Sequence, residues 1–307
     1  MPINPISLAQ DLIRKPSVTP VDAGAMDVLE AALRPLGFDC QRLPFEGIEN
    51  LYARRGTKGP NLAFAGHTDV VPVGDSTAWK MGPFEAQIID GILYGRGAVD
   101  MKGAIAAWVA AVDRVLAKGE PAGSLSLLIT GDEEGKAIHG TGPVVEHLLA
   151  SGEVIDHVVL GEPTSAARLG DQLKIGRRGS LNAWITVEGV QGHVAYPQLA
   201  ENPVHTLAPA LAELTARVWD AGDEFFQPTT FQISNLNAGT GAPNVIPGEL
   251  KARFNLRYSP VQTVEALKKT VEDILTRHGV RYTLEWYVSG EPFYTPPGDL
   301  STAAVEA

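Results

Sequence analysis

The sequence is poor in the features that mark secreted, membrane-bound and nucleic-acid-binding proteins. Its single cysteine, Cys40, cannot form an intrachain disulfide, and residues 1–10 lack the basic and apolar segments of a secretory signal. No apolar run approaches the roughly 20 residues that span a bilayer. With 25 Lys and Arg against 36 Asp and Glu, the net charge of −11 opposes binding to phosphate backbones. We therefore expect a cytoplasmic protein without a membrane or nucleic-acid partner, whose excess carboxylates favour a metal ion.

The 307 residues suffice for about two domains, and the order of predicted elements changes near Arg177. Before this point, short apolar runs typical of strands buried on both faces alternate with segments of helical periodicity. The predicted strands are Asn61–Ala65, Leu125–Thr130 and His157–Leu160, and the predicted helices are Ala104–Leu116 and Thr141–Ala150. Such βα alternation predicts an α/β catalytic domain over residues 1–177, with a mostly parallel sheet and helices on both faces.

After Arg177 the strands alternate polar and apolar residues, and the order of elements becomes βαββαβ. The predicted strands are Leu181–Val187, Thr229–Asn235, Glu249–Tyr258 and Arg281–Val288. Two amphipathic helices are predicted to start at Asn202-Pro203 and at Ser259-Pro260, each a capping residue followed by proline. These elements fit a ferredoxin-like α+β unit over residues 178–290. We expect it to be an insertion, after which residues 291–307 return to the first domain.

Side chains that can bind metal follow three of the apolar runs in the first domain. After a glycine come His67-Thr68-Asp69, then Asp132-Glu133-Glu134, and then Glu162. Because the carboxyl ends of parallel strands face one crevice, we expect these groups to converge. Asp100, in the glycine-rich turn GRGAVDMKG before the next helix, adds a fourth contribution. Carboxylates gathered in this way repel one another unless a cation lies among them, so the sequence predicts a metal centre.

The types of donor suggest which metal binds and how the work is divided. One imidazole among carboxylates suits zinc, with manganese or cobalt as alternatives, and a shared carboxylate suits two ions. By hypothesis Asp100 bridges the ions, His67 and Glu162 complete one site, and Glu134 binds the second ion.

Two acidic residues remain for other roles. Glu133 is free to take a proton from water bound to the metal, whose pKa zinc can lower to about 7. Asp69 is placed to accept the second N–H of the imidazole of His67 and so to orient the ring. This division of labour predicts a metallohydrolase.

Simpler explanations exist for each pattern taken alone. A hydrogen-bonded loop, a helix cap or a solvated turn would explain any one of them, but none explains why all four lie beside glycines at the ends of apolar runs. Other mechanisms lack their motifs: Gly97 is followed at the third position by Asp100 where a dinucleotide fingerprint has glycine, Lys102 precedes its glycine, and no G-x-S-x-G elbow occurs.

A series of longer blocks runs across nearly the whole chain. In order they are GHTDVVPVGD, DGILYGRGAVDMKG, TGDEEG, GEPT, GRRGSLN, GVQGHVAYP, ENPVH, AGTGAPNVIPG and FNLRYSP. In these blocks the chain resembles the succinyl-diaminopimelate desuccinylase family, part of the di-zinc aminoacylase and carboxypeptidase superfamily. The superfamily motifs alone would also fit an N-acetylornithine deacetylase or a carboxypeptidase. The blocks GRRGSLN, QGHVAYP and GTGAPNVIPG favour the desuccinylases.

The resemblance implies a function and further site residues. The reaction would be hydrolysis of N-succinyl-LL-2,6-diaminopimelate to succinate and LL-2,6-diaminopimelate, a step toward lysine and diaminopimelate. The inserted domain would mediate homodimerisation, with His193 reaching the partner's active site to stabilise the oxyanion and Asn244 nearby. Arg178 and Arg257 resemble residues that bind substrate carboxylates. A cis peptide bond after Asp100 is also implied.

The chain departs from the family at its end. Family members continue for several tens of residues and carry a late histidine that ligates the second metal, whereas no histidine follows His278 here. We therefore expect the second metal site to be incomplete in this chain, and little activity from the 307 residues alone. An inactive dimerising fragment thus stands as an alternative to the desuccinylase.

Overall fold

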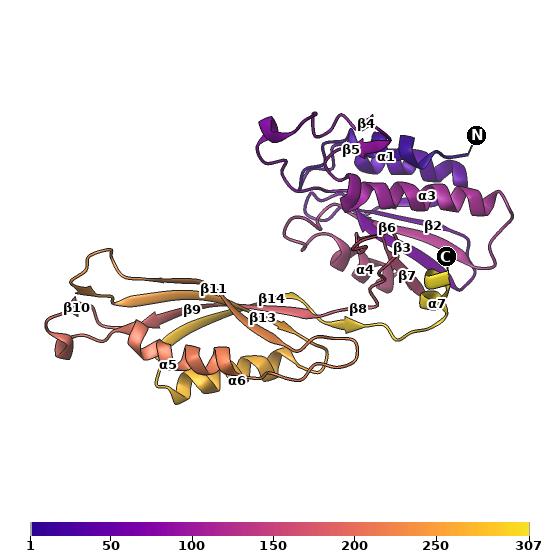
Figure 1. Ribbon diagram of the computed structural model, residues 1–307. Helices are drawn as coiled ribbons and strands as arrows, with labels where there is room; N and C mark the ends of the chain where they lie inside the picture. Colours follow the sequence, from indigo (N-terminus) through magenta and orange to yellow (C-terminus); the bar gives the residue numbers. More distant parts are fainter. Residues whose placement is uncertain (1, 307) are drawn as a thin grey trace. The chain divides into compact units, whose positions relative to one another are not determined.

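A computed structural model describes residues 2–306 and divides the chain into two compact units, Met1–Asp171 and Gln172–Ala307 (Figure 1). The division falls close to the predicted change of element order near Arg177. The return of residues 291–307 to the first domain stays a prediction. Among the described residues, no helix has the length and apolar character needed to cross a membrane.

Unit 1 is built on a five-stranded sheet in the order β1-β2-β6-β3-β7. Its strands are β1 (Asp39–Arg42), β2 (Leu51–Arg55), β3 (Asn61–His67), β6 (Ser124–Thr130) and β7 (His157–Leu160), and a separate hairpin joins β4 (Gln87–Ile89) to β5 (Ile92–Tyr94). The three strands predicted from apolar runs, β6, β3 and β7, pair in parallel. The hairpin of β1 and β2, which the sequence did not reveal, adds antiparallel strands on one side.

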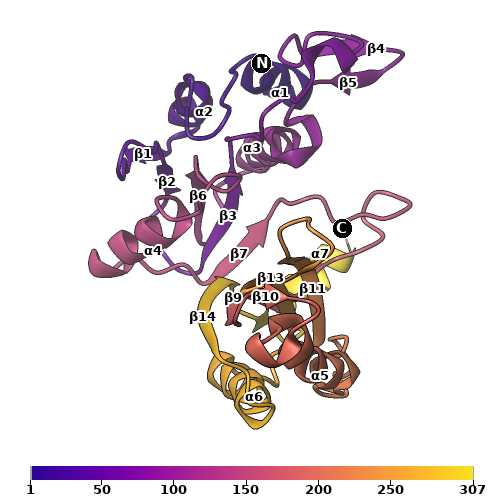
Figure 2. The same ribbon diagram turned by 90° about the vertical axis from the view of Figure 1, so that its left-hand side faces the viewer.

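Helices cover both faces of this sheet (Figure 2). They are α1 (Pro5–Ile13), α2 (Ala25–Leu33), α3 (Gly103–Leu116) and α4 (Thr141–Ala150). Successive residues of β6 point to opposite faces: Leu127 packs in the core formed with α1, α2 and α3, whereas Leu128 packs against Val144 and Leu148 of α4. The predicted α/β architecture with helices on both sides is confirmed.

Strand β7 differs from its prediction. We expected His157–Leu160 to be buried on both faces, but all four residues are exposed, with Val158 at 50% and Leu160 at 57%. The prediction of burial is wrong because β7 is an edge strand, which pairs only with β3. An apolar run shows that a strand can be buried, but the elements packed on it decide whether it is.

Unit 2 contains a four-stranded antiparallel sheet in the order β11-β13-β9-β14. Its strands are β9 (Gly179–Glu188), β11 (Thr230–Ala238), β13 (Glu249–Tyr258) and β14 (Tyr282–Gly290), and its two long helices are α5 (Pro203–Ala216) and α6 (Val264–Arg277). With the chain order βαββαβ, this is the predicted ferredoxin-like arrangement. Shorter elements complete the unit: β8 (Gly176–Arg177), β10 (Gly192–His193), β12 (Val245–Ile246), β15 (Phe293–Tyr294) and α7 (Asp299–Glu306).

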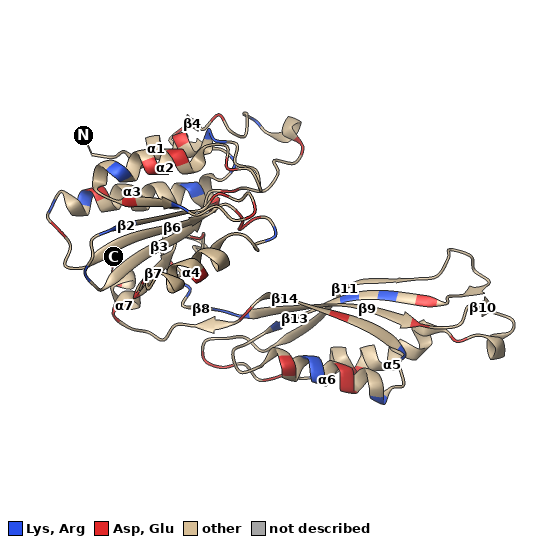
Figure 3. Cartoon of the chain, turned by 180° about the vertical axis from the view of Figure 1, so that it is seen from behind, with Lys and Arg blue, Asp and Glu red and all other residues tan. Residues whose placement is uncertain are grey.

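Both long helices of unit 2 pack on one face of the sheet, as Figure 1 shows. Leu207 and Leu214 of α5 and Leu267 and Val271 of α6 share a core with the inward-facing residues of the strands. Figure 3 shows bands of both charges along α6, and charged residues such as Glu265, Lys269 and Asp273 are exposed. This pattern of one apolar and one charged side is what drives an amphipathic helix onto a sheet.

The start of α6 corrects a second prediction. The helix begins at Val264 rather than after Ser259-Pro260, and the hydroxyl of Thr263 caps it by accepting the N–H of Ala266. Ser259 is fully buried, and its N–H donates to the hydroxyl of Thr229, so it closes the preceding strand. The other helix starts where predicted, with Asn202 accepting the N–H of Val204 before α5.

Candidate metal centre

His67 is the buried centre of a cluster of carboxylates in unit 1. It is the last residue of β3, and its side chain is only 1% exposed. Its Nδ1 lies 2.9 Å from the backbone oxygen of Asp69. Because this backbone oxygen accepts the Nδ1–H, the orientation of the imidazole ring is fixed, and Nε2 is the atom of His67 that can bind a metal.

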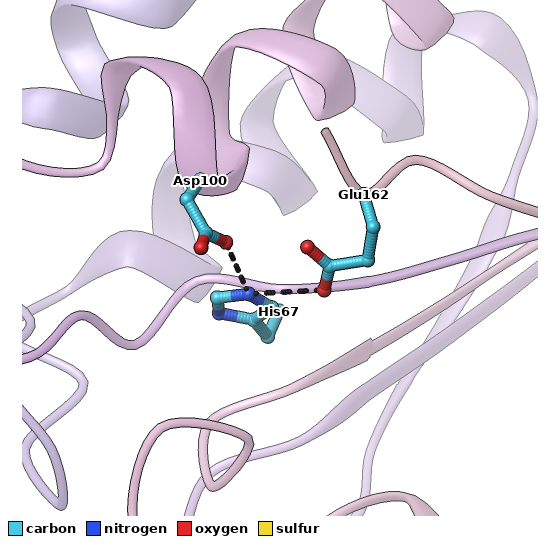
Figure 4. A group of neighbouring side chains, drawn as sticks. All are labelled: His67, Asp100 and Glu162. Carbon is cyan, nitrogen blue, oxygen red and sulfur yellow. Dashed lines mark hydrogen bonds and ion pairs between the residues drawn. The ribbon is translucent and has the colours of Figure 1, made fainter. Parts of the chain in front are cut away.

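Carboxylates from other segments surround Nε2 of His67 (Figure 4). The Oδ1 atom of Asp100, from the distorted helical turn η3 (Ala98–Lys102), lies 3.0 Å away, and Oε1 of Glu162, just beyond β7, lies 3.3 Å away. Glu133, which follows β6, places Oε2 at 3.9 Å. The convergence expected from the ends of the parallel strands is therefore present. The peptide bond between Asp100 and Met101 is cis, as the resemblance implied.

The donors form two overlapping sets around His67. Asp100 and Glu162 make one set with the imidazole, and Glu133 and Glu134 make the other, with the ligand atoms of each set within 4.8 Å of one another. The first set contains the residues predicted for one ion. The second set contains Glu134, predicted for the second ion, together with Glu133, predicted as the base. The geometry brings together all five candidate ligand and base residues, and their separate roles stay predictions.

The electrostatics of the cluster fit a divalent cation. Burial, together with the charges of Asp100 and Glu133, raises the pKa of Glu162 to about 7 in spite of His67. Burial and the same neighbouring acids also raise the pKa of Glu134. Burial disfavours protonation of His67, but its hydrogen bonds to Asp69 and the charge of Glu162 outweigh that effect and raise its pKa to about 9. A cation among these groups would relieve the repulsion, and the set of one imidazole and several carboxylates suits zinc, manganese or cobalt.

Asp69 contacts more of the site than the sequence suggested. Its carboxylate oxygen lies 3.5 Å from Nδ1 of His67, farther than its own backbone oxygen. The same carboxylate accepts the N–H groups of Glu133 at 3.2 Å and Glu134 at 2.9 Å. Asp69 therefore joins the imidazole segment to the segment that carries the two glutamates.

The glycines before the ligands have a packing role. A Cβ added at Gly66 or at Gly161 would collide with the side chain of Met101, and at Gly161 also with Phe64. Met101 is fully buried and directly follows Asp100. Only glycine lets β3 and β7 approach the turn that carries Asp100 this closely.

Several buried polar residues near the cluster were not assigned from the sequence. Lys102 is fully buried and donates to the backbone oxygens of Leu12 at 3.0 Å and Lys15 at 2.8 Å. Asp132 and Asn50 are buried as well, and both form hydrogen bonds with backbone groups of residues 131–139, the segment that contains Glu133 and Glu134. Asp132 stood in the TGDEEG block, but the sequence held no sign of the backbone groups that it meets.

The site residues predicted in unit 2 fall into two groups. His193 of β10 pairs with Val245 of β12, and the backbone of its neighbour Val194 bonds to that of Asn244, so the exposed His193 and Asn244 lie together. Arg178 directly precedes β9, and its guanidinium donates to the backbone oxygen of Pro228 at 3.2 Å. Arg257 lies opposite Ser180 near the same end of the sheet. Figure 1 shows β10 and β8 at opposite ends of unit 2.

Known proteins share both parts of this arrangement. Residues 175–283 match the family model described as the peptidase dimerisation domain. The chain is 55% identical over 98% of its length to the succinyl-diaminopimelate desuccinylase of Alkalilimnicola ehrlichii, of which it covers 81%. It is 57% identical over 99% of its length to that of Caulobacter vibrioides, of which it covers 79%. Among solved structures, an M20 family metallo-carboxypeptidase from Sulfolobus solfataricus has the same fold, with a TM-score of 0.75, 19% identity, and coverage of 95% of this chain and 80% of that one.

Proposed function

The chain belongs to the succinyl-diaminopimelate desuccinylase family, and from this membership we propose that it is a metal-dependent amidohydrolase that converts N-succinyl-LL-2,6-diaminopimelate into succinate and LL-2,6-diaminopimelate. A cytoplasmic location and a place in the formation of lysine and diaminopimelate are part of this proposal. The observation that carries the chemistry is the convergence of Asp100, Glu133 and Glu162 on Nε2 of the buried His67.

We propose that Asp100, Glu162 and His67 would hold one ion, that Asp100 would also serve a second ion, and that Glu134 would ligate the second. Zinc is the proposed metal, with cobalt as an alternative, because both accept imidazole nitrogen and carboxylate oxygen. When bound, the metal supplies Lewis-acid polarisation of the scissile carbonyl and lowers the pKa of water.

The chain's own residues supply the proton transfers and the orientation. Glu133 has a half-exposed side chain, and its backbone N–H is held by Asp69, so its carboxylate can reach incoming water from a fixed backbone position. We assign it as the base that takes a proton from the attacking water and returns it to the leaving amine. Asp69 keeps His67 in one orientation and holds the turn with Glu133 beside it.

Unit 2 supplies groups for substrate recognition in this proposal. The substrate carries several carboxylates, and the guanidinium groups of Arg178 and Arg257 are suited to bind them. His193 and Asn244 would act on the oxyanion in the active site of a partner subunit. The ten residues of β9 separate Arg178 from the segment of His193, which at about 3.3 Å per residue corresponds to about 30 Å. One small substrate cannot bridge that length, which supports a homodimer in which the two groups serve different sites.

The test of the proposed function is release of succinate from N-succinyl-LL-2,6-diaminopimelate by the zinc-replete protein. Values of kcat/KM should be compared with those for N-acetylornithine and for a dipeptide, because the related amidohydrolases act on such substrates. A clear preference for the succinylated substrate is expected. Preference for the acetylated or peptide substrate, or no turnover of any of them, would overturn the substrate assignment.

Two variants then test the roles of the neighbouring glutamates. Glu133→Ala should abolish turnover while leaving the metal content unchanged, since Glu133 is assigned as the base. Glu134→Ala should lower the metal content. The reverse pattern would show that the two roles are exchanged.

An assembly role without catalysis is the second candidate, favoured by the separate hydrophobic core of unit 2. In that case the protein would be a stable dimer, hold less than one tightly bound zinc ion per chain and turn over none of the substrates. Both candidates are dimers, so metal analysis together with the turnover assay distinguishes them.

A further inference from the structure

Asp132 is a buried carboxylate that holds the backbone of the segment following it. Asp132 is only 4% exposed. One oxygen accepts the N–H of Lys136 at 3.0 Å, and the other accepts the N–H groups of Ile138 at 2.9 Å and His139 at 3.0 Å. Such charge-assisted bonds replace the hydration that a buried carboxylate loses.

Asn50, the residue directly before β2, also holds the same segment. It is fully buried, and its Oδ1 accepts the N–H of Gly131 at 3.3 Å. Its Nδ2 donates to the backbone oxygen of His139 and to that of Leu43, both at 3.0 Å. The side chain of Asn50 thus binds residues 131 and 139, the two ends of the segment whose inner N–H groups bind Asp132.

Glu133 and Glu134 lie inside this segment, which is held on its other side as well. Their two N–H groups donate to the carboxylate of Asp69, which is 2% exposed. Residues 131–139 contain neither helix nor strand, so no regular ladder of hydrogen bonds fixes them. Three buried polar side chains do so instead, and all three contact backbone rather than the carboxylates of the glutamates.

We propose that Asp132, supported by Asn50, is a positioning residue for the reaction: it fixes residues 131–139 so that Glu133 and Glu134 point at His67 before metal or substrate binds. This inference rests on the proposed function for its catalytic consequence. Holding the two glutamates in place in advance reduces the ordering that would otherwise accompany metal binding and catalysis.

The variant Asp132→Asn tests this with little change of volume. Both carboxylate oxygens accept backbone N–H groups, so an amide in either orientation leaves at least one N–H facing an NH2 group. The segment should loosen while the carboxylates of Glu133 and Glu134 remain. We expect kcat to fall by about 10- to 100-fold, the usual range for residues that orient ligands, and KM to change by less than about twofold.

The matched control is Asp220→Asn in unit 2. Asp220 also holds loop backbone: its Oδ1 accepts the N–H groups of Gly222 at 2.9 Å and Thr229 at 3.0 Å, and its Oδ2 accepts an N–H from Nε2 of Gln262 at 3.2 Å. In Asp220→Asn the amide oxygen can keep both backbone N–H groups while the NH2 group faces Nε2 of Gln262, so we expect a modest loss of stability and no change of kcat. A purely structural role for Asp132 predicts the same behaviour for both variants.

Two readouts do not need turnover. In the protein without added metal, the amides of Lys136, Ile138 and His139 should exchange with solvent at least about tenfold faster in Asp132→Asn, while Asp220→Asn leaves them unchanged. The visible absorption spectrum of the Co2+-loaded protein should change in Asp132→Asn only. If the parent protein shows no desuccinylase activity, the proposed function fails, but these two measurements still test the positioning role.

The variant Asn50→Ser covers the case in which Asp132→Asn does not fold. It removes the contacts to Gly131 and His139 but keeps the carboxylate of Asp132, so a smaller loss of kcat in the same direction is expected. The proposal is overturned if either folded variant keeps parental kcat, exchange rates and Co2+ spectrum, or if Asp220→Asn reproduces the changes.

Discussion

Two neighbouring strands of unit 1 each end in a proposed ligand, but they differ in how firmly the structure holds it. Strands β3 and β7 pair in parallel. The last two residues of β3 are Gly66 and His67, and β7 is followed by Gly161 and Glu162. His67 at the end of β3 is 1% exposed, whereas Glu162 beyond β7 is 28% exposed. The residues of β3 are buried or half-buried, whereas those of β7 are all exposed.

The difference arises from position in the sheet. β3 pairs on both sides, with β6 and with β7, whereas β7 pairs on one side only. Phe64 in β3 packs in the core with Met101 and Trp108, so the end of this strand is fixed from several directions. His67 is thus held in place by the packing of the sheet, whereas Glu162 follows an edge strand that is packed on one side only. We infer that the imidazole sets the position of the centre and that Glu162 adapts to it.

The largest expected effect concerns the stability of the two strands. Phe64→Ala removes a core side chain and should lower the free energy of unfolding by about 3–5 kcal/mol. Leu160→Ala, one residue along on the paired strand and 57% exposed, should change it by no more than about 0.5 kcal/mol. Urea denaturation of both variants measures the difference. Equal losses would show that β7 is as firmly packed as β3.

The next effect concerns metal affinity. His67→Ala should weaken zinc binding by more than the roughly 10- to 100-fold that is typical of losing a residue that only orients a ligand. Glu162→Ala should cost less, because its removal also relieves repulsion with Asp100 and Glu133, which help to raise the pKa of Glu162. Competition with a chelator measures both affinities. A greater loss for Glu162→Ala than for His67→Ala would contradict our account of the two strands.

The sequence predicted the elements of this comparison but not their burial. The runs Asn61–Ala65 and His157–Leu160 are equally apolar, and both form strands at the predicted places. Periodicity reports how a strand can pack, whereas burial depends on which other elements cover it. The same dependence on distant residues explains Ser259. Its neighbour Pro260 suggested a helix cap, but the N–H of Ser259 donates to the hydroxyl of Thr229, 30 residues earlier.

In the site, too, residues marked by their sequence neighbours were predicted, whereas residues whose partners lie far away in the sequence were not. His67, Glu134 and Glu162 were predictable because each lies beside a glycine at the end of an apolar strand, and the topology of parallel strands brings such positions together. Asp100 was predictable from the glycine-rich turn before the next helix. Asp132 and Asn50 were not assigned, because their partners are backbone groups. Asn50 meets Gly131 and His139, 81 and 89 residues away. Neither residue type nor spacing in the sequence marks a contact of this kind.

A smaller effect should follow from the exposed apolar side chains of β7. Val158 and Leu160 are 50% and 57% exposed on an edge strand, which is the kind of surface that binds hydrophobic dyes and other chains. Val158→Thr should reduce the fluorescence of a bound anilinonaphthalene dye by a measurable fraction. Val218→Thr is the control, since Val218 is 82% exposed in unit 2 but lies outside any strand. An equal reduction in both variants would show that single exposed residues, and not the edge of β7, bind the dye.

The smallest expected effect tests how β7 is held at its beginning. The carboxylate of Asp156 accepts the N–H of Asn61 at 2.7 Å, and Asn61 in turn accepts the hydroxyl of Ser126 at 2.9 Å, so the start of β7 is tied to β3 and β6. Asp156→Ala removes this carboxylate contact but keeps the backbone bond from the N–H of Asp156 to the oxygen of Asn61, so it should lower the free energy of unfolding by about 1 kcal/mol or less. The amides of His157 to Leu160 should exchange faster, while those of Ala63 to Ala65 keep their rates, because β3 retains its bonds to β6. If both strands loosened together, β7 would be part of the same cooperative unit as β3, and the contrast between a firm and an adaptable ligand would disappear.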